Sequence, residues 1–426
     1  MIPSHPHHLL VLRGGDGGIE MTRTIRIGAA RALALLAATL CFQWKCADAQ
    51  TVDDTWIGSA GQWNVAANWS SGEPLNGTPP GATYNVAISN GGAVTMSNGL
   101  NSSTPIDNLT VGSSSSLSIV DGNNLTITGN TLANAGTIAL NSGGHATYIG
   151  IDASRVTLSG GGTITMSNNA NNYIVGSATA DTLVNEETIQ GSGSIGGGNG
   201  SISLTLVNSG VIDANQSAGM VIQANGGTTN KGTLESTAGA TLYLSGTFTN
   251  SAGSILADAS GLKLSNAIVN GGSVTLSGDS TLQLFGATIH GGSTLTNSAT
   301  GVIEALVDSN NTLGGTVNNS AGGVIQIDDD ATVNLEKGSY SSLGAVPRLL
   351  RTRRVLQEFP FREHRNRGRQ PEYEEKNREL LPERIPRPVY TNPTINSRNT
   401  EPHDDKGDRA RHRGVCTGRA KEPCES

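Results

Sequence analysis

A short phrase of residues recurs along the middle of the chain at a nearly constant spacing. An apolar and a small residue precede Asn, and small residues then lead to Ile, Val or Leu, as in LVNSGVI at 206–212. After Asn185, copies follow at intervals of 23, 22, 20 and 20 residues, at Asn208, Asn230, Asn250 and Asn270. Such a repeat predicts a solenoid, in which each repeat buries its apolar side only against its neighbours.

The segments between these copies have the periodicity of β-strands. Apolar and polar residues alternate at 241–244 (TLYL) and 281–284 (TLQL), as they do in half-buried strands. The 56 Gly among 426 residues disfavour helices, because Gly costs about 1 kcal/mol in a helix interior. The sequence therefore predicts an all-β protein, a parallel β-helix over 91–344. Its coils would stack about 4.8 Å apart, and the N- and C-terminal extensions are expected to be disordered.

The Asn of the repeated phrase suits a turn between strands. Asn tolerates left-handed backbone geometry, and the amides of stacked turns can hydrogen-bond to one another. The column is expected to continue past Asn270, with His290 standing in the place of Asn. We predict a structural turn ladder at Asn208, Asn230, Asn250, Asn270, His290 and Asn318. A ligand site along the same column is the alternative.

The N-terminal residues predict export. Residues 21–49 read as a signal peptide, with arginines before an apolar core at 32–42 and the small-residue cleavage site Ala47-Asp48-Ala49. The apolar core is too short to span a bilayer. Residues 1–20 are interpreted as an over-extended gene start. The predicted localisation is extracellular or at a bacterial cell surface.

Charge divides the rest of the chain near residue 344. Residues 50–344 carry 4 basic and 19 acidic groups, a net charge of −15, whereas residues 345–426 carry 19 basic and 13 acidic groups, a net charge of +6. The acidic body disfavours nucleic acid as a partner. The charged tail, 345–426, is predicted to be disordered. It is either a frameshifted translation or a basic arm that binds nucleic acid or anionic surfaces.

All three Trp of the mature chain fall within a short segment at its start. Trp56, Trp63 and Trp69 lie in the predicted N-terminal cap, residues 50–90. A cap would cover the first coil, whose open edge would otherwise favour aggregation. The alternative is a possible glycan-binding platform on which sugars stack against the indole rings.

The tryptophans and the repeats together carry a family resemblance. The pattern W-x-G-x-x-G-x-W-x-x-x-x-N-W at 56–69, followed by N-x-G-x-[IV] coils, resembles bacterial secreted autotransporter-associated β-strand repeat proteins. The resemblance covers about 51–344 and implies a right-handed β-helix like an autotransporter passenger. It also implies display at the outer membrane or cell surface. Separately from the resemblance, we predict an adhesin-like role toward surface glycans or host and matrix surfaces.

The body offers few residues for chemistry. Residues 50–344 contain no Cys, and His145 and His290 are their only histidines. The G-x-G-x-x-G at 191–196 cannot hold a dinucleotide, because the glycines after it cannot start the required helix. The run at 328–330 (DDD) predicts a solvated turn, with a Ca²⁺ site as the alternative. We therefore expect no catalysis, no cofactor, no metal and no small-molecule substrate.

Two other functions stay open at this point. The first is a polysaccharide-active β-helix enzyme, a lyase or a hydrolase, which would bring aspartates together with Arg155, the only Arg of the body. The second is a fragment of a longer autotransporter that has no function of its own. The leading prediction is a secreted or surface-displayed structural, adhesin-like rod.

Overall fold

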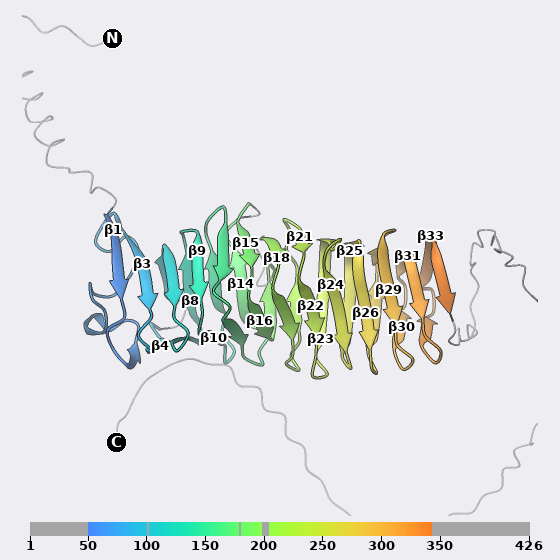
Figure 1. The fold of residues 1–426 in the computed structure, drawn as a ribbon, viewed down its shortest axis with the longest axis horizontal. Helices are drawn as coiled ribbons and strands as arrows, with labels where there is room; N and C mark the ends of the chain where they lie inside the picture. The colour runs from blue at the N-terminus through green and yellow to red at the C-terminus, as the bar shows by residue number, and fades with distance from the viewer. Residues whose placement is uncertain (1–49, 100–101, 179, 198–203, 343–426) are drawn as a thin grey trace, which may run out of the picture. The chain divides into compact units, whose positions relative to one another are not determined.

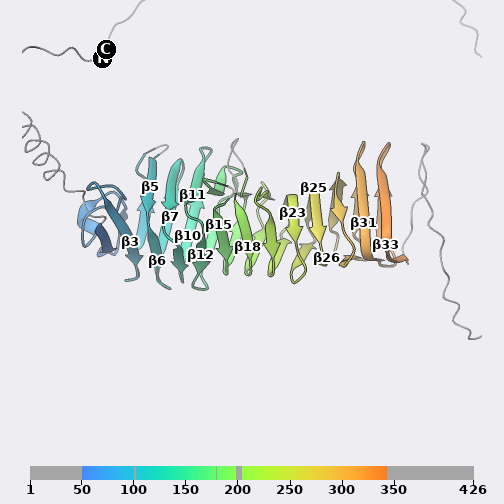
Figure 2. The same cartoon turned by 90° about the horizontal axis from the view of Figure 1, so that it is seen from above.

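A computed structural model describes residues 50–99, 102–178, 180–197 and 204–342. These residues form an all-β solenoid of about 11 turns, which confirms the predicted parallel β-helix. Strands stack in sequence order from β1 to β33 along one axis (Figures 1 and 2). The predicted gene start (1–20), signal peptide (21–49) and charged tail (345–426) lie outside the described residues.

Each turn of the solenoid contributes strands to three faces, here called A, B and C. Within each face the strands run parallel to one another. Face A contains β1 (Gln50–Thr55), β3 (Ala82–Ile88), β6 (Asn108–Val111), β9 (Thr131–Asn134), β12 (Val156–Ser159), β15 (Thr182–Asn185), β18 (Thr205–Asn208), β21 (Thr228–Asn230) and β28 (Thr288–Ile289). Face B contains β2 (Ala60–Gln62), β4 (Ala93–Met96), β7 (Ser116–Val120), β10 (Thr137–Asn141), β13 (Thr163–Met166), β16 (Thr188–Gly191), β19 (Val211–Ala214), β22 (Thr233–Ser236), β24 (Ser254–Asp258), β26 (Gly272–Ser277) and β29 (Ser293–Asn297). Face C contains β5 (Ser102–Ile106), β8 (Asn123–Ile127), β11 (Thr147–Ile151), β14 (Asn172–Gly176), β17 (Gly193–Ile195), β20 (Met220–Ile222), β27 (Thr281–Phe285), β30 (Val302–Ala305) and β32 (Val324–Ile327).

Four long strands bend around a corner and belong to two faces. Two of them run from face C to face A, namely β23 (Thr241–Thr249) and β25 (Gly261–Asn270). The other two run from face A to face B, namely β31 (Asn310–Asn319) and β33 (Thr332–Ser342). A single 3₁₀ turn, η1 (Ala66–Asn68), interrupts the strands of the described chain.

The interior is built from columns of apolar side chains in register. On face B one column places one side chain from each of nine successive coils at 0–1% exposure, at Leu117, Ile138, Ile164, Ile189, Ile212, Leu234, Ile255, Val274 and Leu295. Strand alternation thus places every second residue in a narrow core. Burial of this apolar surface stabilises the stack by roughly 25 cal/mol per Å².

The outer side of face B carries a matching column of hydroxyl groups. Its ten in-register positions are all Ser or Thr except Val211, and they are Ser116, Thr137, Thr163, Thr188, Val211, Thr233, Ser254, Ser273, Thr294 and Thr316. None of these side chains is fully buried. The parallel register therefore fixes a line of hydroxyls at the coil spacing of about 4.8 Å.

Candidate functional site

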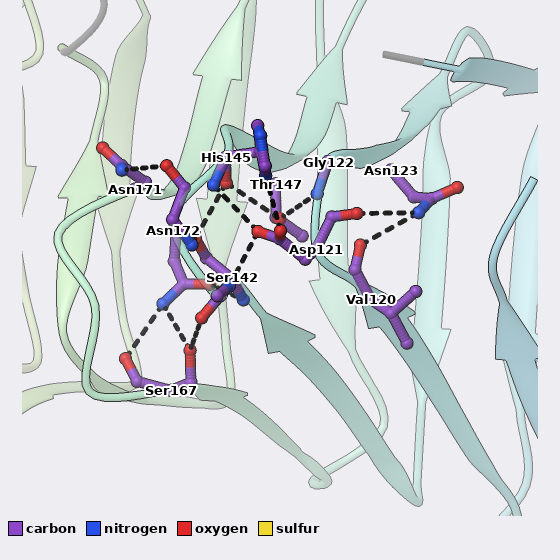
Figure 3. Close-up of polar contacts among 12 residues, drawn as sticks. Val120, Asp121, Gly122, Asn123, Ser142, His145, Thr147, Ser167, Asn171 and Asn172 are labelled. Carbon is purple, nitrogen blue, oxygen red and sulfur yellow. Dashed lines mark hydrogen bonds and ion pairs between the residues drawn. The ribbon is translucent and has the colours of Figure 1, made fainter. Parts of the chain in front are cut away.

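A network of polar contacts surrounds Asp121 and His145 at one corner of the solenoid (Figure 3). Asp121 follows β7, and His145 lies one coil later, between β10 and β11. One carboxylate oxygen accepts hydrogen bonds from the backbone N–H groups of Gly143 (2.7 Å) and His145 (2.8 Å). The other carboxylate oxygen lies 2.6 Å from His145 Nδ1. The hydrogen bond from the His145 ring, followed by the two backbone bonds, lowers the pKa of Asp121 to about 2.

Among the described residues, no Ser or Thr hydroxyl is hydrogen-bonded to the ring of His145. The neighbouring Ser142 hydroxyl donates to the backbone carbonyl of His145 (2.8 Å) rather than to its ring. Asn172, which is fully buried beside Ser142, connects adjacent coils through hydrogen bonds. Its amide donates to Ser167 O (2.9 Å) and accepts from Ser142 N (3.0 Å) (Figure 3). It also donates to Ser192 O (3.2 Å). The arrangement stabilises a turn. Sequence reasoning missed the pair, although its separation of 24 residues is one coil.

Four asparagines form a continuous ladder where face A turns into face B. Asn185 donates to Asn208 (2.8 Å), Asn208 donates to Asn230 (2.9 Å), and Asn230 donates to Asn250 (2.7 Å). All four side chains are 0–1% exposed. Each amide also donates to a backbone carbonyl, as Asn208 does to Gly210 O (3.2 Å) and Thr233 O (3.1 Å). The ladder therefore satisfies polar backbone groups inside the stack.

The other predicted ladder positions lie elsewhere. Asn270 pairs with Thr249, one position before the corner, and is only half-buried. His290 occupies the next coil at the same level, and its Nδ1 lies 3.4 Å from Glu336 Oε1. Beyond Asn250 this corner turns on glycines with positive φ, such as Gly271 and Gly272. These glycines leave no side-chain amide to extend the column.

A second, shorter ladder lies at the corner between faces B and C. Asn297 ends β29 and donates to Asn319 (2.8 Å), the last residue of β31. Asn318, which we predicted in the ladder, is its half-buried neighbour and accepts a hydrogen bond from the Ser341 hydroxyl (3.0 Å). The two ladders therefore run along different edges of the solenoid.

A buried glutamate bridges a gap beside the first ladder. The coil before Asn185 turns the corner on Gly160, Gly161 and Gly162 and supplies no side-chain amide there. Glu187 is 3% exposed and reaches past this coil to accept a hydrogen bond from Asn134 Nδ2 (3.0 Å). Burial raises the pKa of Glu187 above its ordinary value of 4.5, and the Asn134 hydrogen bond offsets only part of that increase.

We expect Glu187→Gln to change how stability depends on pH. The folded state holds the Glu187 proton more tightly than the unfolded state, because burial raises its pKa. Its stabilising contribution is therefore complete below about pH 4.5 and declines as pH rises through the folded-state pKa. Relative to the parent, the Gln variant should become more stable between pH 4 and pH 7.5 in urea unfolding. Glu186→Gln, at an exposed neighbour, is the control. An equal difference at both pH values for Glu187→Gln would contradict the prediction.

The three tryptophans pack together at the start of the solenoid. Trp56, Trp63 and Trp69 are 1%, 0% and 3% exposed. The ring centroids of Trp63 and Trp69 lie 4.8 Å apart, and those of Trp56 and Trp69 lie 5.0 Å apart, both pairs edge to face. Trp69 Nε1 donates to Trp63 O (2.7 Å). Because no ring face is open to solvent, a sugar could stack here only if the surrounding segment moved away.

The predicted cap segment already contains the first coil. Within residues 50–90, β1 pairs with β3 in parallel from Gln50↔Ala82 to Thr55↔Ala87. The Trp56 ring lies against Gly92 of the next coil, where an added Cβ would be 2.4 Å from the ring. The tryptophans therefore fill the interior of this end of the stack.

No family model, curated protein or solved structure matches this chain. In the part of the chain that the structure describes, no helix is long and apolar enough to cross a membrane. Within the same described ranges, no three His, Cys, Asp or Glu side chains gather as metal ligands would. The resemblance to autotransporter-associated repeat proteins accordingly stays a prediction.

Two groups of acidic residues lie in different parts of the solenoid. Asp328, Asp329 and Asp330 form a turn, closed by a hydrogen bond from Ala331 N to Asp328 O (3.1 Å). Asp213 and Glu235 lie in register on β19 and β22 of face B. Arg155 is exposed, and the described residues contain no ion pair between it and a carboxylate. The convergence of aspartates with Arg155 that a lyase-like site would need is not observed in this part of the chain.

Proposed function

We propose that this protein is a secreted or surface-displayed rod, adhesin-like and structural, which binds surfaces through many weak contacts. One observation carries the proposal: the in-register hydroxyl column on face B, from Ser116 to Thr316. Hydroxyls held at a fixed spacing can each make a weak hydrogen bond to a glycan or matrix surface. Linked contacts of this kind gain affinity because each later contact is intramolecular.

The proposal predicts that removing hydroxyls from face B weakens binding. Thr163→Val/Thr188→Val removes two neighbouring hydroxyls with little change in side-chain shape. We expect apparent affinity for surface glycans to fall by about ten-fold, because avidity multiplies the loss of individual contacts. The measurement is binding of the full chain to a glycan array and to extracellular matrix.

A matched variant separates this effect from altered folding. Thr131→Val/Thr157→Val removes two neighbouring hydroxyls from face A instead. It should bind like the parent, and both variants should unfold at similar temperatures. Absence of binding by the parent chain to every array and matrix surface would refute the adhesive role.

A second candidate, cleavage of a polysaccharide, is favoured by Asp213 and Glu235. Burial raises the pKa of both carboxyls, and the charges of Asp213 and Asp258 raise that of Glu235 further. Neighbouring carboxyls with raised pKa values are suited to general acid–base catalysis. Release of reducing ends from a polysaccharide, abolished by Glu235→Gln, would favour this function over adhesion.

A further inference from the structure

The glycine phrase at 191–196 forms the shortest turn between faces B and C in the described part of the solenoid. Only Ser192 separates β16 from β17, whereas residues 167–171 and 215–219 make the same turn in the neighbouring coils. An added Cβ at Gly191 would lie 1.9 Å from Met166 O, and one at Gly193 would lie 2.3 Å from Asn172 O. Larger residues would therefore collide with the coil below, and the motif has a structural purpose unrelated to dinucleotides.

The longer loops on either side join across this short corner. Asn168 Nδ2 donates to Ser217 Oγ (2.9 Å), and Asn168 Oδ1 accepts from Ala218 N (2.9 Å). These partners are 49 and 50 residues apart, so the bonds pass over one whole coil. The recessed coil between them leaves a hollow on the outer side of face C.

This hollow, here called the face C depression, has a volume of about 300 Å³. Its lining includes Tyr173, Ser194, Ala218, Gly219, Val221 and Gln223. None of the described residues that line it carries a charged side chain. The volume is at the small end of the range for small-molecule sites, about 300–1,000 Å³. It therefore suits a small, uncharged group.

One tyrosine, Tyr173, lines the depression, and a second, Tyr243, lies beside the lining residue Gly219. Tyr173, Ser194, Val221 and Tyr243 follow one another in register on four successive coils. The Tyr243 ring leans toward the depression over Gly219, where an added Cβ would lie 2.9 Å from Cε2 of the ring. The Tyr173 hydroxyl donates to Asn171 Oδ1 (3.1 Å), which holds its ring in place. The Tyr173 ring is therefore positioned before any ligand arrives.

Polar groups at the depression can select for hydroxyls. The exposed Gln223 carboxamide makes no hydrogen bond to another described residue, so both its donor and its acceptor are available. The Ser194 hydroxyl donates to Gly197 O and still has acceptor capacity. Aromatic rings with a few hydrogen-bonding groups match a sugar ring, which has apolar C–H faces and a rim of hydroxyls.

We propose that the face C depression binds one neutral sugar unit, against the Tyr173 ring and the Gln223 carboxamide, with the Tyr243 ring at the rim beside Gly219. The site deepens the proposed adhesive function, on which it rests, by naming the ligand class and its place. It lies on face C, whereas the hydroxyl column lies on face B. The two can therefore be tested separately.

The test is saturation-transfer NMR of the full chain with glucose, galactose and N-acetylglucosamine, and with glucuronate as the acidic comparison. Tyr173→Ala and Tyr243→Ala should each weaken binding of the preferred neutral sugar by ten-fold or more. Phe285→Ala is the matched control, because Phe285 is 40% exposed, close to the 37% of Tyr243, and also belongs to face C. It should leave affinity within two-fold of the parent.

The remaining outcomes separate this site from the adhesive role. Array or matrix binding that needs the face B hydroxyls, with no saturation transfer to any free sugar, would overturn the site and leave the adhesive function standing. Sugar binding that persists in both tyrosine variants would also overturn it. Binding of glucuronate alone would overturn the neutral-ligand assignment. Failure of all array, matrix and sugar binding would overturn both proposals.

Discussion

Asn208→Ala is expected to lower the free energy of unfolding by about 2–4 kcal/mol, since a net hydrogen bond is worth about 1 kcal/mol and a buried orphan costs about 1–3. The two N–H groups of the Asn208 amide are shared among three acceptors, Gly210 O, Asn230 Oδ1 and Thr233 O, and its oxygen accepts one hydrogen bond, all inside the stack. Its loss also leaves Asn230 Oδ1 without the donor it has now. Urea unfolding followed by circular dichroism measures the change.

Asn270→Ala is the matched comparison for the ladder. Asn270 belongs to the same sequence repeat, yet it is half-buried and its side chain makes no hydrogen bond to another described residue. Its replacement should change the free energy of unfolding by no more than about 0.5 kcal/mol, as at other surface positions. Equal losses at both positions would mean that the ladder amides contribute nothing special.

The second large effect is expected at the start of the solenoid. Trp63 is fully buried and packs edge to face on Trp69. Trp63→Ala should cost about 3–5 kcal/mol, the usual range when a buried large aromatic is truncated. Because coils contact only their neighbours, the loss should be concentrated near β1 and β3. Hydrogen exchange should show faster exchange there and little change toward β33.

Two further variants keep the test of Trp63 informative. Trp63→Phe retains part of the ring and should lose less stability than Trp63→Ala. Val65→Ala, at a side chain 43% exposed in the same segment, should change the free energy of unfolding by less than about 0.5 kcal/mol. Unaltered hydrogen exchange at β1 and β3 in Trp63→Ala would show that the tryptophans do not hold the first coil.

The architecture could be predicted because each level of the sequence indicates the same fold. The repeat length gives one coil, and alternation in segments such as 241–244 gives the inward positions that the structure buries. Local sequence does not say which corner a turn occupies. The phrase NSA occurs at 250–252 and at 297–299, yet Asn250 lies between faces A and B and Asn297 lies between faces B and C. The summed lengths of the preceding coils decide which corner a turn occupies.

The contacts that determine the candidate sites could not be predicted from the local sequence, for a related reason. Glu187 bonds to Asn134 across a coil that lacks an amide, and Asn168 reaches past a recessed coil to Ser217. Both contacts depend on one coil being unlike its neighbours. A search for the average repeat removes that information. The face C depression likewise arises where the repeat is at its least regular.

In-register stacking also affects how the number of coils in such a chain can change during evolution. The upper surface of one regular coil resembles that of the next, as on face B, where Ile189, Ile212 and Leu234 occupy equivalent positions. Duplication or loss of one whole coil by recombination between similar gene segments would rejoin surfaces that already fit. The length of the rod can therefore change by one coil at a time. The irregular coils, whose side chains bond across a neighbouring coil, are not interchangeable in this way.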